Sequence, residues 1–264
     1  MPASPLVTVV TPTIGNSCVL RALESVAAQT YKPIQHLIVI DNPDASAEIK
    51  SAIRQYNVDV IELPYATGKD RFLGHRIYGA SAFLGKGDFF CFLDEDNWFD
   101  PDHIASLVEV VGRGFHWAFS LRKIVDIEDN FVCNDDCESL GRWPSILAEN
   151  DYHIDVNCYF IPRAIAVRLS PIWYRRFREP NVPDVDRALV FTLRSYHPNY
   201  ETSFRYSVNY RVGNTELSVR KEFFLEGNQR MLQLRSGSLP WKNPKIAAKN
   251  PGNYFPSYST TTKL

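Results

Sequence analysis

Apolar runs of strand length alternate with amphipathic segments of helix length along the first half of the chain. The apolar runs predict strands at 6–11, 36–41, 58–63 and 88–94, and apolar residues at helical spacing predict helices at 16–28, 47–56, 70–84 and 100–112. We expect Pro12 to end the first strand, and Asn16 or Ser17 to cap the first helix. Strands that are apolar throughout, each followed by a helix, are typical of a mostly parallel sheet covered on both faces, so the pattern predicts an α/β fold.

Polar residues stand at the carboxyl ends of three of these predicted strands. They are Thr11, Pro12 and Thr13 after the first strand, Asp41 after the second, and Asp94, Glu95 and Asp96 after the fourth. Ligands bind at this edge of open α/β sheets. Asp94 and Asp96 can share a hard cation such as Mg²⁺ or Mn²⁺, with diphosphate oxygens completing its shell. The alternative is a surface turn whose carboxylates are only solvated.

The second half of the chain is less regular. A strand is predicted at 115–126, a second at 157–162, and a helix at 183–196 whose buried stripe carries Ala188, Leu189 and Leu193. After Glu226 the chain has no acidic residue and six basic ones. We expect this last part to be a mobile or draped extension, most simply a solvated one.

Composition limits the possible functions. Hydrophobic residues make up 45% and charged residues 22% of the chain, and the net charge of −1 gives no global attraction to nucleic acid or to an anionic membrane. No apolar run has the length of a membrane span and no signal peptide is visible, so we expect a cytoplasmic protein. Cys133 and Cys137 lack the partner ligands of a zinc site, and reduced thiols are expected.

Motifs of other nucleotide-binding and hydrolytic enzymes are missing. The segment "ATGKD" at 66–70 lacks the first glycine and the hydroxyl residue of a phosphate-binding loop, and no G-x-G-x-x-G follows the first predicted strand. There is no G-x-S-x-G nucleophile elbow and no H-x-x-x-H metal pair.

Two stretches resemble the opening of glycosyltransferase family 2, in the right order and spacing. They are "VTVVTPTIGNSCVLRALESVAAQTYKPIQHLIVIDN" at 7–42 and "GDFFCFLDEDNWFDPDHI" at 87–104, the second of which carries the D-x-D motif. The resemblance implies the GT-A fold, which is Rossmann-like. It also implies one domain over 1–226, with a nucleotide-sugar-binding half at 1–105 and an acceptor-binding, catalytic half at 106–226, followed by a basic extension at 227–264.

The resemblance implies donor-binding roles at the sheet edge. Asp41 would accept a hydrogen bond from the base, usually uracil, and Thr11 and Pro12, with Thr13 beside them, would frame the base pocket. In the acidic cluster, Asp94 would lie near the ribose and Asp96 would bind the metal, with Asp94 as the second member of the metal pair. Glu95 belongs to the same donor-binding cluster, although strand alternation points it elsewhere. The base is less well specified, because "DNPDAS" replaces the usual "DDGS" of the family.

Two arginines are further donor contacts implied by the resemblance. Arg76 in "GHRIYG" stands where the family has "ARN". Arg211 lies in "VNYRVGNTELSVR" at 208–220, which resembles the closing segment of the family, and can contact the diphosphate. Gly213 stands where the family has a metal-binding histidine, so the metal would have fewer protein ligands.

The catalytic base is expected in "EPNVPDVDRALVFTL" at 179–193, which resembles the E-D pair at the start of a late helix. Asp184 aligns with the base, Pro183 replaces the glutamate, and Asp186 is the rival. The alternative is that Asp184 only caps the helix. Helix N-terminal placement lowers a carboxylate pKa, which limits Asp184 as a base unless burial offsets it.

Acceptor contacts are expected between these two regions. "HIDVNCYFIPRAIA" at 153–166 resembles a family strand near the acceptor, and alternation on that strand places Asp155 and Asn157 on one side, where they can bind sugar hydroxyls. A solvent-facing strand is the alternative. Trp143 can stack on an acceptor sugar or can anchor its loop.

Together these features favour a metal-dependent, inverting glycosyltransferase that uses a UDP- or GDP-sugar, Mn²⁺ or Mg²⁺, and a carbohydrate or glycolipid acceptor, in polysaccharide or glycoconjugate synthesis. The alternatives are a catalytically silent nucleotide- or sugar-binding module on the same fold and a nucleotidyltransferase. No nucleic-acid partner is expected. The basic extension allows at most a peripheral contact with the inner face of a membrane.

Overall fold

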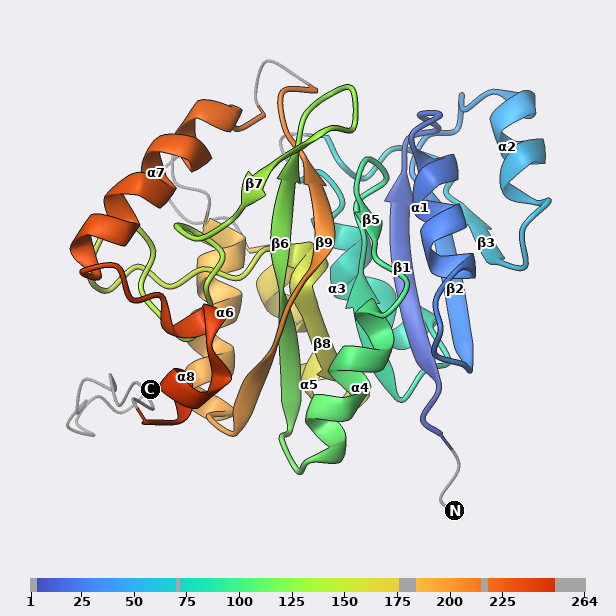
Figure 1. Ribbon diagram of the computed structural model, residues 1–264. Coiled ribbons are helices and arrows are strands. Elements are labelled where there is room, and N and C mark those ends of the chain that lie inside the picture. The colour runs from blue at the N-terminus through green and yellow to red at the C-terminus, as the bar shows by residue number, and fades with distance from the viewer. Residues whose placement is uncertain (1–3, 70–71, 176–183, 215–217, 250–264) are drawn as a thin grey trace.

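The computed structural model describes residues 4–69, 72–175, 184–214 and 218–249. Within these residues nine strands form one mixed sheet in the order β3-β2-β1-β4-β8-β6-β9-β5, with β7 paired to β6 (Figure 1). The strands are β1 Val7–Thr13, β2 Ile34–Ile40, β3 Asp59–Glu62, β4 Phe89–Phe92, β5 Trp98–Phe99, β6 Trp117–Val125, β7 Phe131–Asn134, β8 Tyr159–Pro162 and β9 Tyr200–Arg211. The helices are α1 Val19–Ala27, α2 Ala47–Ile53, α3 His75–Leu84, α4 His103–Gly112, α5 Arg163–Trp173, α6 Asp184–Tyr196, α7 Lys221–Leu234 and α8 Pro244–Lys249, with short 3-10 turns η1 Val156–Cys158 and η2 Pro240–Lys242.

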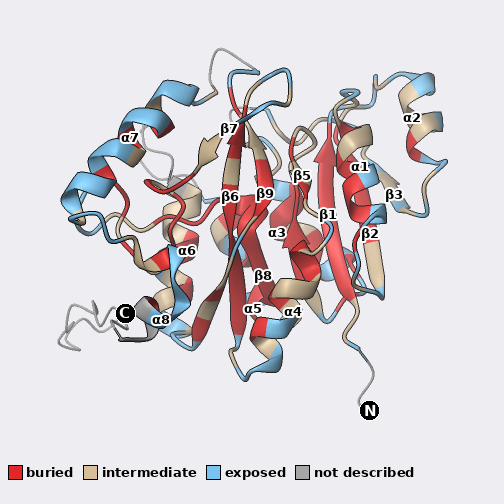
Figure 2. Cartoon of the chain, in the orientation of Figure 1, coloured by how far each residue is buried: buried red, intermediate tan, exposed pale blue. Residues whose placement is uncertain are grey.

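The predicted α/β fold is confirmed. The four N-terminal strands β3, β2, β1 and β4 are parallel, and β1 is buried along its whole length because its apolar residues face helices on both sides. Helices α1 and α4 cover one face of the sheet, and α3, α5 and α6 lie against the other (Figure 1). Figure 2 shows the buried residues concentrated on the central strands.

Several boundaries differ from the predicted ones. The first strand does not end at Pro12, because β1 continues to Thr13. β4 pairs with β1 only as far as Val10, so the side of Pro12 that lacks an N–H faces no neighbouring strand. Helix α1 begins only at Val19, and Asn16 accepts a hydrogen bond from the backbone N–H of Cys18 instead of capping a longer helix.

The second half of the sheet is antiparallel to the first where they meet. β8 pairs antiparallel with β4 and with β6, and stacked rings, such as Phe89 on Phe160 at 4.7 Å, fill the junction. β8 begins only at Tyr159, so the prediction of a strand from residue 157 was wrong by two residues. The predicted helix at 183–196 is confirmed from Asp184 onward, with Leu189 and Leu193 buried as expected.

The chain beyond Glu226 packs on the sheet over its described residues. α7 runs through this position, and Trp241 in η2 is 0% exposed. Its indole Nε1–H donates to Asp136 Oδ1 (2.9 Å), and Lys242 Nζ pairs with Asp136 Oδ2 (2.5 Å). The described part of the expected extension is thus draped on the domain and contributes to its core. Within the described residues, no helix combines the length and apolar character needed to cross a membrane.

Trp241→Ala is expected to lower the free energy of unfolding by about 3–5 kcal/mol, because it empties a fully buried site and removes a hydrogen bond. Urea unfolding followed by circular dichroism measures this. Leu234→Ala, at a residue 65% exposed on the adjoining helix, is the control and is expected to change stability by less than about 0.5 kcal/mol. An equally small effect at Trp241 would contradict the packing described for this segment.

Candidate active site

The acidic turn 94–96 follows β4 directly, at the carboxyl edge of the parallel strands. The backbone N–H of Leu93 still donates to Val10 O (2.9 Å), so the turn begins where pairing with β1 ends. Both carboxylate oxygens of Asp94 are engaged: Tyr78 Oη donates to Oδ1 (2.6 Å) and Asn157 Nδ2 donates to Oδ2 (2.9 Å). Both donors are neutral, so they orient the carboxylate without neutralising its charge.

Glu95 and Asp96 point toward different neighbours. Glu95 accepts hydrogen bonds from Thr13 Oγ1 and, at 3.4 Å, from the backbone N–H of Asn16, which ties the turn to the end of β1. Asp96 accepts from Asn214 Nδ2. The structure therefore brings the predicted residues Thr13, Glu95 and Asp96 together at one edge of the sheet, and their donor-binding roles stay predictions.

Burial raises the pKa of each carboxyl group in the turn. For Asp94, desolvation and the neighbouring charges of Asp96 and Asp155 raise the pKa from 3.8 to about 7. Desolvation raises the pKa of Glu95 to about 6 and also raises that of Asp96, where Arg211 acts in the opposite direction. The turn thus concentrates negative charge that lacks a full counter-charge, which is the electrostatic character of an incomplete cation site.

The raised pKa values predict a stability that falls as pH rises. A carboxyl group whose pKa is raised on folding binds its proton more tightly in the folded state. For Asp94, the resulting contribution to the free energy of unfolding is fully present below the unfolded pKa of 3.8 and is lost as pH rises to about 7. Without divalent cations, the free energy of unfolding of wild type is expected to fall by roughly 2 kcal/mol more than that of Asp94→Asn between about pH 5 and pH 8. Paired urea titrations at both pH values measure this difference, and parallel pH profiles of the two proteins would contradict it.

Asp41 lies at the end of β2 and is 4% exposed. Its two carboxylate oxygens accept hydrogen bonds from the backbone N–H groups of Thr67 (2.6 Å) and Gly68 (2.8 Å). Arg76 in turn donates to Thr67 O (2.8 Å) and stacks over Phe72. Arg76 therefore supports the loop that covers Asp41, and each oxygen of Asp41 keeps a lone pair for a further donor.

Thr11 lies fully buried beneath this edge of the sheet. Its hydroxyl is 2.9 Å from His36 Nε2, and desolvation lowers the pKa of His36 to about 3, so that ring is neutral at physiological pH. Pro12 packs closely against the backbone of Gly74, since a Cβ atom placed on Gly74 would lie only 2.9 Å from Pro12 Cγ. Pro12 therefore packs against the start of α3, whereas Thr11 contacts β2.

Arg211 lies beside the acidic turn. Its backbone N–H donates to Asn97 Oδ1 (2.9 Å), while its guanidinium pairs with Asp129 and contacts Cys18 Sγ (3.0 Å). Arg21 shares Asp129 and stacks over Trp98 at 3.4 Å from the ring centre. Two guanidinium groups therefore gather around Asp129, and the charge of Arg211 also acts on Asp96. The second of them, Arg21, was not predicted from the sequence.

A buried ion cluster lies behind the turn. Arg122 in β6 is 2% exposed, and its three nitrogens contact Asp135 Oδ2 (2.8 Å), Glu138 Oε2 (2.6 Å) and Asp155 Oδ2 (2.5 Å). Asp155 Oδ1 accepts from Asn157 Nδ2 (2.8 Å), which also reaches Asp94. The interpretation of Asp155 and Asn157 as two residues of one strand was wrong, because Asp155 caps η1 and Asn157 lies within it.

These contacts bear on the acceptor-binding roles expected for residues 143, 155 and 157. Asn157 is 0% exposed, and Asp155 is also buried. Trp143 is buried as well, packed near Trp241 (5.6 Å between ring centres) and Phe204 (6.5 Å). Stacking on a sugar needs an exposed ring face, so the structure favours the alternative in which Trp143 anchors its loop; the acceptor roles stay predictions.

Helix α6 connects the predicted catalytic residues to this cluster. Asp184 is its first residue, and the side chain of Asp184 lies outside the described part of the structure. One turn later, Arg187 pairs with Asp151 (2.6 Å) and lies 3.9 Å from Glu138 of the Arg122 cluster. The N-terminal turn of α6 is thus joined through Glu138, Arg122, Asp155 and Asn157 to Asp94.

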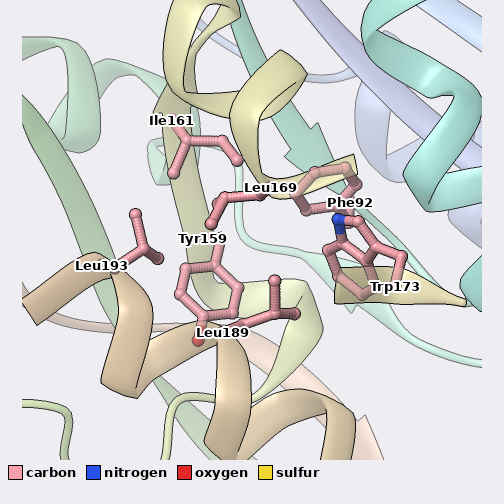
Figure 3. Close-up of a pocket in the computed structure, with 7 residues that line it drawn as sticks. All are labelled: Phe92, Tyr159, Ile161, Leu169, Trp173, Leu189 and Leu193. Carbon is pink, nitrogen blue, oxygen red and sulfur yellow. The ribbon is translucent and has the colours of Figure 1, made fainter. Parts of the chain in front are cut away.

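Asp186 faces a different environment. It precedes Leu189, Val190 and Leu193 at the spacing of the buried stripe, and its Oδ1 is buried without a hydrogen-bond partner among the described residues. Tyr159 Oη is likewise buried and unpaired, and the charge of Asp186 helps to raise the pKa of Tyr159. Figure 3 shows the ring of Tyr159 pointing toward Leu189 and Leu193 of α6. The apolar space between these side chains has no room for a water molecule.

The metal-ligating potential of the described residues is limited. No three His, Cys, Asp or Glu side chains among them are arranged to hold an ion by themselves. All five cysteines are free thiols, and Cys133 and Cys137 belong to no group of three such ligands among the residues that the structure describes. A polar groove of about 400 Å³ between α4, residues 203–205 and η2 is lined by none of the acidic-turn residues.

Comparison with known proteins agrees with this geometry. No curated protein sequence matches the chain. Among solved structures, S. aureus TarS 1-349 in complex with UDP-GlcNAc is similar, with a TM-score of 0.56 and 17% identity over 86% of this chain and 64% of that chain. The mannosyltransferase PcManGT from Pyrobaculum calidifontis, in complex with GDP-Man and Mn²⁺, has a TM-score of 0.54 and 14% identity over 94% of this chain and 70% of that chain. The chain spans 44% of the longer TarS structure.

At such low identity these likenesses establish the fold, which is that of GT-A glycosyltransferases. The sequence comparison goes further, because residues 8–176 match the family described as Glycosyl transferase family 2, and this match covers more than half of the chain. The protein therefore belongs to Glycosyl transferase family 2 and is a glycosyltransferase.

Proposed function

We propose that this glycosyltransferase moves a sugar from a UDP- or GDP-sugar to a hydroxyl of a carbohydrate or glycolipid acceptor, with inversion at the anomeric carbon and with Mn²⁺ or Mg²⁺ as cofactor. The observation that carries the proposal is the turn of three carboxyl groups, Asp94, Glu95 and Asp96, whose pKa values burial raises. Similar folds bind UDP-GlcNAc, or GDP-Man with Mn²⁺, which supports both candidate bases.

The acidic turn fits a hard cation that keeps some of its coordinated water molecules. Asp96 would be the main protein ligand, and Asp94, whose oxygens already accept from Tyr78 and Asn157, would be the second. Because the described residues provide no three-ligand site, diphosphate and water oxygens would complete the coordination. When bound, the cation supplies Lewis-acid stabilisation of the charge that develops on the leaving diphosphate.

Residues around the turn would bind the rest of the donor. Asp41, fixed by Thr67 and Gly68, would accept a hydrogen bond from the base, with Thr11 and Pro12 forming the floor of that pocket. Arg211 and Arg21, which now share Asp129, would offer donors to diphosphate oxygens. The positive charge of these two arginines would partly compensate for the metal-binding histidine that the family has where this chain has Gly213.

Transfer would be a single displacement. The acceptor oxygen attacks the anomeric carbon and forms the new glycosidic bond as the bond to the diphosphate oxygen breaks. The hydroxyl proton passes to a carboxylate on the first turn of α6, Asp184 with Asp186 as its rival. The ion cluster around Arg122 would hold this turn in a fixed position relative to Asp94.

A screen of nucleotide sugars with Mn²⁺ or Mg²⁺, analysed for both nucleoside diphosphate and pyrophosphate, tests the proposal. We expect slow, metal-dependent release of UDP or GDP from one donor, accelerated by the acceptor. Release of pyrophosphate would indicate a nucleotidyltransferase instead. Tight donor binding without release of either product, over a panel of acceptors, would indicate a silent binding module.

A binding role for the basic extension, residues 227–264, would be a contact with an anionic membrane or with the diphosphate of the donor. Removal of everything after Glu226 would also remove the buried Trp241 and so would confuse binding with folding. The informative truncation ends after Lys249, the last described residue.

A further inference from the structure

Asn157 is buried completely, yet it contacts the acidic turn twice. Its Oδ1 accepts a hydrogen bond from the backbone N–H of Asp94 (2.6 Å), and its Nδ2 donates to Asp94 Oδ2 (2.9 Å). One amide group therefore fixes both the main chain and the carboxylate of Asp94. A side chain that is 0% exposed has no surface to offer a sugar, so these contacts are its function in the folded protein.

Asp155 sets the orientation of this amide. Asp155 Oδ1 accepts from both the backbone N–H (3.0 Å) and Nδ2 (2.8 Å) of Asn157. In the flipped orientation, the amide oxygen of Asn157 would face two carboxylates and its NH₂ would face the N–H of Asp94. The backbone N–H of Asp94 and Asp94 Oδ2 would then lose their Asn157 partners, and Asp155 Oδ1 would keep only the backbone N–H of Asn157, so the observed orientation is the favoured one.

Arg122 holds Asp155 in turn. Its guanidinium donates to Asp155 Oδ2 (2.5 Å), is fixed by Asp135 and Glu138, and stacks over Tyr210 at 4.2 Å from the ring centre. Removing one partner from a buried ion cluster leaves an uncompensated charge, so the cluster resists rearrangement. The chain Arg122, Asp155, Asn157 and Asp94 is therefore a rigid connection from the centre of β6 to the donor site.

Tyr78 closes the other side of Asp94. Its hydroxyl donates to Oδ1 (2.6 Å), and its ring is buried against Phe92 and Trp173. Both oxygens of Asp94 are thus directed before any ligand binds. Asp96 differs, because its side-chain partner is Asn214, which is exposed.

We propose that Asn157 is the positioning residue of the donor site: oriented by Asp155 and Arg122, it holds Asp94 in the geometry that receives the cation and diphosphate. This inference rests on the proposed function. Asp94 is the rigid half of the acidic pair and Asp96 the adaptable half. In this inference Asn157 and Asp155 act on Asp94 and not on the acceptor.

Isothermal titration of UDP, or of GDP if wild type prefers it, in the presence and absence of Mn²⁺ tests the inference without turnover. Asn157→Ala is expected to weaken Mn²⁺-dependent nucleotide binding at least about tenfold, since Asp94 loses its two contacts with Asn157 and keeps only Tyr78, and to leave metal-free binding unchanged. Asn209→Ala is the matched control: Asn209 is also buried and its Nδ2 donates to a carboxylate, Asp100 Oδ1 (2.9 Å). We expect it to retain the wild-type affinity.

Asn157→Asp separates position from charge. If Asn157 acted only through the net charge of the site, an added carboxylate would strengthen Mn²⁺ binding; positioning predicts that it weakens binding, as alanine does. Asp155→Asn keeps the shape of the cluster and is expected to weaken binding because the amide orientation is no longer fixed. Circular dichroism with urea unfolding establishes that each variant is folded before its titration.

Wild-type affinity in folded Asn157→Ala and Asn157→Asp would overturn the inference while leaving the proposed function in place. Tighter Mn²⁺ binding by Asn157→Asp would also overturn it. Wild type that binds neither nucleotide with Mn²⁺ would overturn the proposed function and the inference together.

Discussion

Asp96→Asn is expected to lower the rate of metal-dependent sugar transfer at least about 100-fold, equivalent to about 2.7 kcal/mol of transition-state stabilisation. Asp96 is the carboxylate of the acidic turn with the fewest fixed partners, and an amide in its place keeps the shape but loses the charge that attracts a divalent cation. The same substitution is expected to weaken Mn²⁺-dependent UDP binding without unfolding the protein. Steady-state kinetics over a range of Mn²⁺ concentrations measures both effects.

Asp88→Asn is the matched control, because Asp88 immediately precedes the opposite end of β4 and is exposed. Its loss removes one negative charge at a distance from the turn, so activity is expected to stay close to that of wild type. If Asp96→Asn kept full activity and full metal dependence, the cation would have to bind elsewhere. Equal losses in Asp88→Asn and Asp96→Asn would indicate a general charge effect.

Asp184→Asn is expected to lower kcat by about 10²–10⁴-fold, the range for loss of a general base, while Mn²⁺-dependent nucleotide binding is retained. The reason is its position: α6 begins at Asp184, and the first turn of α6 is joined to the donor site through Arg187, Glu138 and Arg122. Single-turnover rates with a saturating donor separate this effect from binding.

Asp186→Asn is the comparison that decides between the two candidates. Asp186 lies on the buried stripe of α6 next to Tyr159, so its replacement is expected to change stability more than kcat. A large loss of kcat in Asp186→Asn with little change in Asp184→Asn would transfer the role of base to Asp186. Full activity in both variants would place the base outside α6.

The sheet and its ligand-binding edge could be predicted because each signal is local. Strands β1 to β4 are short apolar runs separated by helical segments, and the residues at the carboxyl ends of β1, β2 and β4 meet at one edge by the geometry of parallel strands. The contact of Thr13 with Glu95 is one such meeting, between residues far apart in sequence. Pro12 was misinterpreted because its effect depends on where β4 ends beside β1, and that is a tertiary fact.

The rest of the site depends on long-range contacts that no local pattern carries. Asp155 was expected to bind a sugar because strand alternation placed it on one side with Asn157, but Arg122, 33 residues before it, makes its burial tolerable. Asn157 meets Asp94 across 63 residues. In the basic C-terminal segment, composition indicated solvation, whereas a single tryptophan, Trp241, anchors it in the core.

The charge of the acidic turn destabilises the folded protein and favours the binding proposed for this site. Burying three carboxyl groups with raised pKa values disfavours folding above neutral pH, and the same unneutralised charge favours binding of a cation with a diphosphate. Asn157 and Tyr78 direct this charge without cancelling it. Stability and binding are therefore expected to respond in opposite directions when Asp94 is replaced by asparagine.

The most direct test is a set of three calorimetric titrations of the wild-type protein: Mn²⁺ alone, UDP or GDP alone, and the nucleotide in the presence of Mn²⁺. If the turn is a cation site that diphosphate completes, Mn²⁺ alone binds weakly and the metal increases nucleotide affinity at least about tenfold, with the reciprocal effect of nucleotide on Mn²⁺. Nucleotide affinity that is the same with and without Mn²⁺, in a protein that binds the nucleotide, would contradict the role assigned to Asp94 and Asp96.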